Sequence, residues 1–219
     1  KLDRWFFQKR HWLENNKQKI VMRIISGKFK GIKIYAPIDK EIRPLKDIAR
    51  ESIFNFLIHS NKISFRFEES NILDLYSGTG SFGLECLSRN AANVIFVEKE
   101  KEAIKILEKN IKKLNVKDFT KIIFDDVFNV IKKNKKNFFI TTHHLKLDLI
   151  FCDPPFKDTN ISHLIELIAK KDLLKKNGII VLHRHKNSKE KFTNCLKIID
   201  ERIYGLSKII FGQPLLLLP

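Results

Sequence analysis

The sequence lacks long apolar runs. A transmembrane helix needs roughly 20 consecutive apolar residues, and the closing leucine run covers only residues 215–218. The first residues, KLDRWFF, also lack the apolar stretch of a signal peptide. These absences favour a cytoplasmic protein that makes no membrane contact.

Cysteine is scarce as well, and the three cysteines lie far apart in apolar contexts: Cys86, Cys152 and Cys195. This predicts reduced, buried thiols rather than a disulfide framework. His183 and His185 follow the predicted strand at 179–182, and because alternate residues on a strand can share one face, a site with two metal ligands is conceivable there. No set of cysteines and histidines stands at the spacing of a zinc site, so we expect no metal.

Acidic residues are outnumbered by basic ones. The 219 residues contain 42 Lys and Arg but 25 Asp and Glu, which gives a formal net charge of +17 and a pI near 9.8. The excess is spread along the chain and favours a polyanionic partner held by salt-dependent contacts. A basic protein without such a partner is the plainer alternative. The length suits one domain with a small appendage, and we expect a monomer.

A glycine-rich segment is the first positive signal. Residues 71–85 read NILDLYSGTGSFGLE, which predicts a strand that stops at a glycine turn and opens a helix. Such a turn presents backbone N–H groups and a helix N-terminus to a nucleotide-like ligand. A tight strand–helix turn without any ligand is the bland alternative.

The ligand of this turn can be a dinucleotide or S-adenosylmethionine. The pattern from Gly78 to Gly83 fits the fingerprint G-x-G-x-x-G, and Glu98 follows near the distance of a ribose-binding acid. A nicotinamide dehydrogenase must therefore be considered. Asp74 favours the methyl donor instead, because a carboxylate there attracts the cationic methionine end of that donor and repels a pyrophosphate.

A second motif, DPPF at residues 153–156, has no role in hydride transfer. An exocyclic amino group of a base needs acceptors for its hydrogens before it can attack a methyl group. Asp153 offers a carboxylate, and the Pro154 carbonyl is a natural second acceptor because a proline followed by a proline is confined to extended geometry. Phe156 can stack on the base. Both motifs together predict methyl transfer to an amino nitrogen of a base, whereas a proline-rich turn that Asp153 caps is the alternative.

Alternating strands and helices predict an α/β fold. The predicted strands cover residues 72–76, 94–97, 121–124, 147–152 and 179–182, and a terminal antiparallel hairpin covers 198–204 and 208–211. Helices are predicted at 47–58 and 101–114, and a small hairpin at 22–35. Ligands bind beyond the carboxyl ends of such strands, where four acids are expected on one edge: Asp74, Glu98, Asp126 and Asp153.

Further stretches carry a resemblance to a known family. They read MRIISGKFKG (22–31), IRP (42–44), RESIFN (50–55), DLYSGTG (74–80), GLE (83–85), VE (97–98), DPPF (153–156) and YG (204–205). With them the chain resembles the RsmD-type 16S rRNA guanine-N2 methyltransferases of bacteria, from residue 22 to about residue 212. Leu45 and Lys46 depart from the two threonines usual in that family, and His183 stands where an acid is common.

The resemblance implies a class I methyltransferase fold, which is a Rossmann-like, mostly parallel seven-stranded sheet with a terminal antiparallel hairpin. It implies an N-terminal extension that is disordered or not native (1–21), an RNA-facing hairpin and helix (22–62) and the methyltransferase domain (63–213). Catalysis is implied for Asp153, Pro154, Pro155 and Phe156. Binding of S-adenosylmethionine is implied for Asp74, Tyr76, Ser77, Gly78, Thr79, Gly80, Glu98, Lys99, Asp125 and Asp126. RNA contacts are implied for Arg23, Lys28, Lys30, Arg43 and Arg50.

The implied substrate is 16S rRNA in the small ribosomal subunit. DPPF alone also permits an amino methyltransferase on another nucleic acid, such as DNA adenine or tRNA guanine, and the N-terminal stretches argue against that alternative. A non-catalytic RNA-binding assembly module with a vestigial pocket is a third hypothesis. The intact glycine set, Glu98 and Asp153 argue against it.

Overall fold

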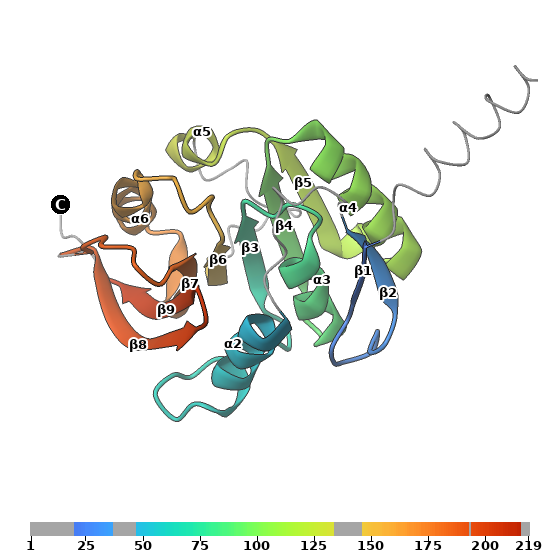
Figure 1. Ribbon diagram of the computed structural model, residues 1–219, viewed down its shortest axis with the longest axis horizontal. Coiled ribbons are helices and arrows are strands. Elements are labelled where there is room, and N and C mark those ends of the chain that lie inside the picture. The colour runs from blue at the N-terminus through green and yellow to red at the C-terminus, as the bar shows by residue number, and fades with distance from the viewer. Residues whose placement is uncertain (1–19, 37–46, 134–145, 193, 216–219) are drawn as a thin grey trace, which may run out of the picture.

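The computed structural model describes residues 20–36, 47–133, 146–192 and 194–215. Its centre is a seven-stranded sheet with the strand order β5-β4-β3-β6-β7-β9-β8 (Figure 1). The strands are β3 (Asn71–Leu75), β4 (Asn93–Glu98), β5 (Thr120–Phe124), β6 (Leu147–Cys152), β7 (Leu174–His185), β8 (Leu196–Tyr204) and β9 (Ser207–Pro214). The first five are parallel, and β9 is antiparallel to both β7 and β8. The predicted fold class is confirmed.

The sheet contains a topological switch point. The chain runs outward from β3 through β4 to β5 and then returns to place β6 on the other side of β3. The connections to the helices therefore diverge between the carboxyl ends of β3 and β6. Open α/β sheets bind their ligands at such a point, and both sequence motifs follow these two strands.

Two hydrophobic cores lie on the two faces of the sheet. On β4, Val94 and Phe96 belong to one core, whereas Ile95 and Val97 belong to the other. The first core is covered by α2 (Asp47–His59), α3 (Ser81–Ser88) and α4 (Lys101–Leu114), and the second by α5 (Val127–Lys132) and α6 (Ile161–Lys170). Burial of both faces explains why the central strands read as continuous apolar runs.

The element boundaries agree closely with the prediction, except that β7 starts earlier and β9 runs on to Pro214 rather than ending at residue 211. The helix expected at 101–114 is α4, and the helix expected at 47–58 is α2 with one further residue. Strand β7 begins at Leu174, well before the predicted start at residue 179. Its first part contains exposed polar residues, such as Lys175 and Lys176, so this part carries no apolar pattern.

The N-terminal hairpin consists of β1 (Ile20–Arg23) and β2 (Lys33–Ala36). Its buried residues share the first core with α2 and the sheet, so the predicted boundary at residue 62 does not separate two cores. Ile20 and Val21, assigned to the N-terminal extension from the sequence, belong to β1. The rest of that predicted extension lies outside the described residues.

Two composition-based expectations concern cysteine and membranes. Cys86, Cys152 and Cys195 are buried and free, as predicted. Within the described ranges, no helix combines the length and apolar character that crossing a bilayer requires.

Candidate active site at the carboxyl edge of the sheet

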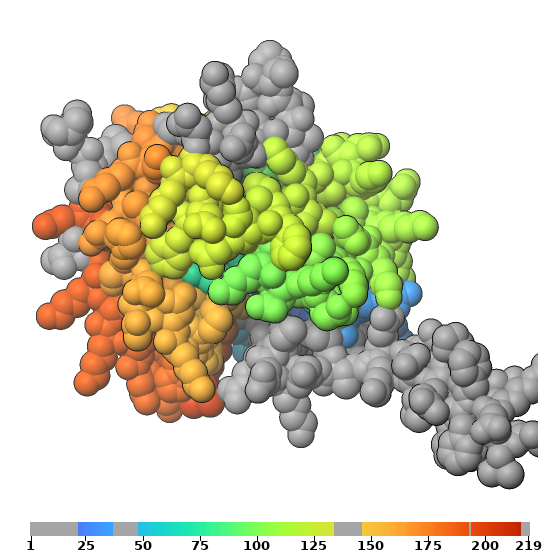
Figure 2. Space-filling view, turned by 90° about the horizontal axis from the view of Figure 1, so that it is seen from above, coloured from blue at the N-terminus to red at the C-terminus, as the bar shows by residue number. Residues whose placement is uncertain are grey.

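The sheet register brings the two motifs together. Leu75, the last residue of β3, pairs with Val97 of β4 on one side and with Cys152 of β6 on the other. The glycine turn and the DPPF segment thus leave neighbouring strands at the same edge. Figure 2 looks onto this edge from above, and the teal-green segment after β3 shows between the orange and the green parts of the surface.

The glycine turn is built by close approach of backbone to side chains. Gly80 precedes α3 with φ 81°, and a Cβ atom there would lie 2.3 Å from Leu107 Cδ1. Gly78 has φ 53°, but a Cβ atom there would meet open space. Gly80 therefore serves packing, whereas Gly78 leaves room beside the turn for a ligand.

Ser77 and Thr79 hold the turn through their backbones. Ser77 N–H donates to the Val97 carbonyl over 3.0 Å, and the Ser77 carbonyl accepts from Gly80 N–H over 2.8 Å. The Thr79 carbonyl accepts from the side-chain amide of Asn110 on α4 over 3.1 Å. Both residues are buried, so the turn is fixed before any ligand binds.

Asp74 is a buried acid at the end of β3. Its Oδ2 accepts from Gly83 N–H over 3.0 Å and so fixes the start of α3. Burial raises the pKa of Asp74 well above its usual value, the Gly83 N–H opposes this, and the nearby Asp153 and Glu98 carboxylates raise the pKa further. A bound cation lowers the electrostatic repulsion within such a cluster of carboxylates, whereas a bound anion increases it. The edge therefore suits the cationic S-adenosylmethionine and not a pyrophosphate.

Glu98 has a backbone role that the sequence did not reveal. Its Oε2 accepts from Gly78 N–H over 2.7 Å, and its Oε1 accepts from the N–H groups of Lys99 and Glu100 over 2.8 and 2.9 Å. One side chain thus joins the glycine turn to the start of α4. The predicted ribose contact would use lone pairs that these bonds leave free.

We expect Glu98→Ala to weaken binding of S-adenosylmethionine by about 1–3 kcal/mol, because the predicted charge-assisted hydrogen bonds to the ribose would be lost. The glycine turn also loses its anchor at Gly78. Isothermal titration of the donor measures the effect, with Glu102→Ala on the exposed side of α4 as the control. Unchanged donor affinity in Glu98→Ala would remove this residue from the donor site, and NAD binding by the wild type would favour the dehydrogenase alternative.

Asp125 and Asp126 follow β5 and have different surroundings. Asp125 accepts from Asn129 and pairs with Lys133, and the Lys133 hydrogen bond is the main cause that lowers its pKa to about 2. Asp126 caps α5 by accepting from Phe128 N–H, and its other oxygen lies 3.4 Å from Lys99 Nζ. Asp126 has fewer and longer side-chain contacts than Asp125, so it is the better candidate to accept a hydrogen bond from the adenine amino group.

The DPPF segment is clamped by a residue that the sequence analysis missed. Arg184 of β7 is buried, and its guanidinium donates to the carbonyl oxygens of Pro155, Phe156 and Asp158 over 3.1, 3.5 and 2.7 Å. In the described part of the chain, the carbonyl of Pro154 accepts no hydrogen bond. It is therefore left available as the predicted second acceptor.

Tyr76 connects the glycine turn to the DPPF segment. Its hydroxyl donates to Asp158 Oδ2 over 3.1 Å, and burial together with neighbouring acidic groups raises the pKa of Tyr76. Asp158 in turn is held by Arg184 through its carbonyl. The two motifs therefore form one hydrogen-bonded unit.

His183 also belongs to this site. Its Nδ1 lies 2.7 Å from Asp153 Oδ1, and the ring of Phe156 stands edge-on to the rings of His183 and His185 at centroid distances of 5.3 and 5.4 Å. The sequence contains no direct signal for this contact, beyond the alternating histidines and the histidine at a position where an acid is common in the family. Because the Phe156 ring contacts both imidazoles, the two histidines share one face of the strand, as predicted.

The predicted RNA-binding residues are not all at the surface. Arg23, Lys28 and Lys30 of the hairpin are exposed, whereas Arg43 lies outside the described residues. Arg50 is fully buried, and its Nη2 donates to the carbonyl of Arg23 over 2.9 Å. The expectation that Arg50 grips RNA is therefore corrected, because its guanidinium connects α2 to the hairpin inside the protein.

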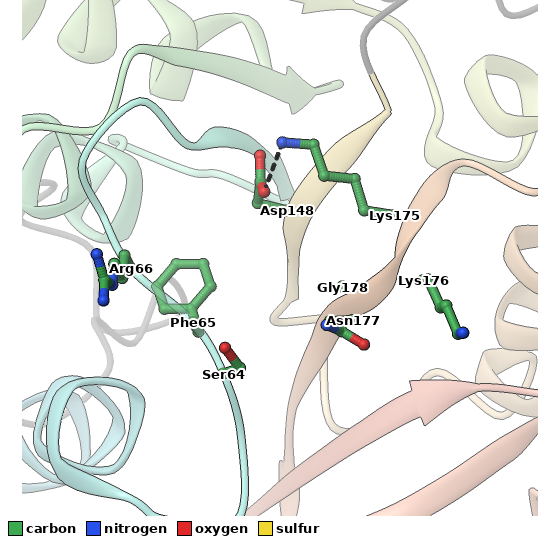
Figure 3. Close-up of a pocket in the computed structure, with 8 residues that line it drawn as sticks. All are labelled: Ser64, Phe65, Arg66, Asp148, Lys175, Lys176, Asn177 and Gly178. Atoms are coloured by element: carbon green, nitrogen blue, oxygen red, sulfur yellow. Dashed lines mark ion pairs between the residues drawn. The ribbon is translucent and has the colours of Figure 1, made fainter.

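A hollow at the opposite edge of the sheet is separate from this site. It has a volume of about 290 Å³ and is lined by Ser64, Phe65, Arg66, Asp148, Lys175, Lys176, Asn177 and Gly178 (Figure 3). Lys175 Nζ pairs with Asp148 Oδ1 over 2.8 Å, and Asp148 Oδ2 accepts from Asn71 N–H. These residues flank the amino ends of β3 and β6, so the hollow is not the predicted active site.

The sheet order, the glycine turn at the switch point and the acids around it define a class I S-adenosylmethionine-dependent methyltransferase. Residues 22–213 match the family model described as Conserved hypothetical protein 95. The chain belongs to this family, whose members include ribosomal RNA small subunit methyltransferase D.

Individual relatives agree with this assignment. The chain is 34% identical to ribosomal RNA small subunit methyltransferase D of Buchnera aphidicola subsp. Baizongia pistaciae, over 77% of this chain and 79% of that protein. Among solved structures, the putative methyltransferase yhhF from Escherichia coli superposes with a TM-score of 0.73 at 23% identity, over 89% of this chain and 98% of that one. The fold is also shared with a putative methyltransferase complexed with SAH, SMU.776, at a TM-score of 0.60 and 16% identity, over 83% of this chain and 53% of that one.

Proposed function

We propose that this protein transfers a methyl group from S-adenosylmethionine to the exocyclic N2 of a guanine in 16S rRNA of the small ribosomal subunit. The observation that carries the proposal is the placement of the DPPF carboxylate, Asp153, next to the buried acid Asp74 and to Glu98 at the switch point of the sheet, where both carboxylates raise the pKa of Asp74. Relatives named ribosomal RNA small subunit methyltransferase D support the class of substrate. We infer that the protein works as a monomer in the cytoplasm.

The residues around the glycine turn are proposed to hold the donor. Asp74 lies near its methionine end, Glu98 accepts from the ribose hydroxyls, and Asp126 accepts from the adenine amino group. Gly78 leaves the space into which the donor fits. When bound, S-adenosylmethionine supplies a methyl group carried on a cationic sulfur, and the acidic edge stabilises that cation.

The DPPF segment is proposed to hold the target base. Asp153 and the Pro154 carbonyl accept the two hydrogens of the amino group, so that its lone pair is directed out of the base plane. Asp153 takes the proton that the nitrogen loses on methylation and returns it to water. Phe156 stacks on a base that has been flipped out of the RNA, as enzymes that modify bases require.

Substrate preference tests the proposal. We expect methylation of purified small subunits at a rate well above that of naked rRNA and of duplex DNA at matched salt. The hairpin and α2 offer little surface for reading sequence, and positive charge supplies affinity without identity. Mass mapping of the methylated nucleoside identifies the base and the atom. Equal rates on naked rRNA and subunits would contradict recognition of the particle, and a preference for DNA adenine or tRNA would favour those alternatives.

The contribution of the exposed hairpin lysines to RNA binding can be measured in the same methylation assay. Reversing Lys28 and Lys30 to Glu should raise KM for the subunit and leave donor affinity unchanged, because both side chains are exposed. The control that matches it in charge reverses Lys191 and Lys197, two exposed lysines in and shortly before β8 at the far end of the sheet. Donor binding without any methylation of RNA would favour the non-catalytic assembly module.

A further inference from the structure

The contact between His183 and Asp153 involves a side chain that no motif predicts. Strand β7 lies parallel to β6, with Leu182 opposite Cys152. His183 follows Leu182, and Asp153 follows Cys152, so these two residues stand side by side at the carboxyl edge of the sheet. His183 Nδ1 lies 2.7 Å from Asp153 Oδ1. The imidazole side chain is 7% exposed, whereas the Asp153 side chain is 23% exposed. The histidine therefore lies behind the acid and reaches the site through it.

The chemistry of the pair fixes the direction of the hydrogen bond. A carboxylate can only accept, so Nδ1 of His183 carries the proton and donates it to Oδ1. This leaves Oδ2 of Asp153 as the oxygen that faces a substrate. The ring of Phe156 stands edge-on to the imidazole, and the backbone of His183 is paired in the sheet with that of the buried Ile209 of β9.

Packing alone does not account for an imidazole here. Nε2 of His183 is buried and has no hydrogen-bond partner among the described residues. A leucine would fill similar space without burying an unpaired polar atom, which costs free energy. The gain that offsets this cost is at the other nitrogen, on Asp153.

We infer that His183 is a positioning residue for methyl transfer, and this inference rests on the proposed function. By holding Oδ1, His183 prevents rotation of the Asp153 carboxylate and directs Oδ2 at one N–H of the target amino group. Phe156, which packs on the same imidazole, is fixed relative to the acid. The base plane and the acceptor are therefore set by one side chain.

The test compares three substitutions that differ in where they place a donor. His183→Leu has no donor, His183→Asn places an amide N–H near the position of Nδ1, and His183→Gln places it near Nε2. We expect kcat on subunits to fall about 100-fold in His183→Leu and in His183→Gln, the size of loss that a misplaced group causes. In His183→Asn, kcat should stay within a few-fold of wild type. KM for subunits and donor affinity should stay unchanged in all three.

A double-mutant cycle separates positioning from general damage. In an Asp153→Ala background, His183→Leu should lower kcat far less than it does alone, because most of its effect passes through the acid and only the contact with Phe156 is left to lose. His163→Leu, at an exposed position of α6, is the control, and melting temperatures report folding. If His183→Leu does not fold, the comparison of His183→Asn with His183→Gln decides between positioning and general damage.

The outcomes distinguish this inference from the proposed function. If the wild type is active but His183→Asn and His183→Gln lose kcat equally, or His183→Leu loses none, the role of His183 alone is overturned. Additive losses in the Asp153→Ala background would do the same. A wild type that methylates no RNA would overturn the proposed function and the inference with it.

Discussion

Asp153→Ala is expected to lower turnover on small subunits by a factor of roughly 10²–10⁴, which corresponds to about 3–5 kcal/mol of transition-state stabilisation. The carboxylate is assigned to the amino group, whose developing positive charge it stabilises. Its side chain is partly exposed at the edge, whereas Asp74 behind it is buried. The loss should therefore appear in kcat measured with saturating donor and saturating subunits.

Donor binding should survive the same substitution. Asp153 raises the pKa of Asp74 through charge repulsion, so its removal leaves Asp74 easier to ionise and no worse as a partner for a cation. Isothermal titration checks this, and Asp118→Ala at an exposed site is the control. Near-normal turnover in Asp153→Ala would exclude Asp153 from the mechanism, and lost donor affinity would move it to the donor site.

Asp153→Asn sharpens the same prediction. In this variant the side-chain carbonyl oxygen would accept the hydrogen bond from His183, so the side-chain NH₂ group would face the amino group of the target base. Two hydrogen-bond donors cannot pair with each other. We therefore expect Asp153→Asn to lower kcat on small subunits as much as Asp153→Ala does.

The fold and the position of the site could be predicted because their signals are local. Apolar runs mark the strands, and acids at the ends of parallel strands must meet at one edge whatever the loops do. Asp74, Glu98 and Asp153 were predicted to lie there, and the register places them there. Their assigned chemical roles remain predictions.

The contacts that hold the site together could not be predicted from local signals. His183 meets Asp153 across 30 positions, and Arg184 meets Pro155 across 29. Arg50 carried the charge expected of an RNA contact, yet tertiary packing buried it. A charged residue in an amphipathic helix reads as exposed unless the partner that compensates its burial is known.

The last prediction concerns another contact of this kind, between Glu85 and the hairpin. Glu85 on α3 is fully buried; its Oε2 accepts from Ile25 N–H over 2.7 Å, and its Oε1 accepts from Ser26 N–H over 2.9 Å. Arg89 also donates to Oε1, over 3.0 Å, while its guanidinium stacks on Phe54. One buried acid thus satisfies two backbone donors and one cation.

Glu85→Ala should lower the free energy of unfolding by about 3–5 kcal/mol, because it leaves a partly buried guanidinium and two N–H groups without their acceptor. Urea denaturation measures the loss, with Glu108→Ala at an exposed position of α4 as the control. Since the hairpin carries Lys28 and Lys30, subunit binding should weaken at temperatures where the donor site still binds S-adenosylmethionine. A loss below about 1 kcal/mol would mean that the hairpin is held by its apolar contacts rather than by Glu85.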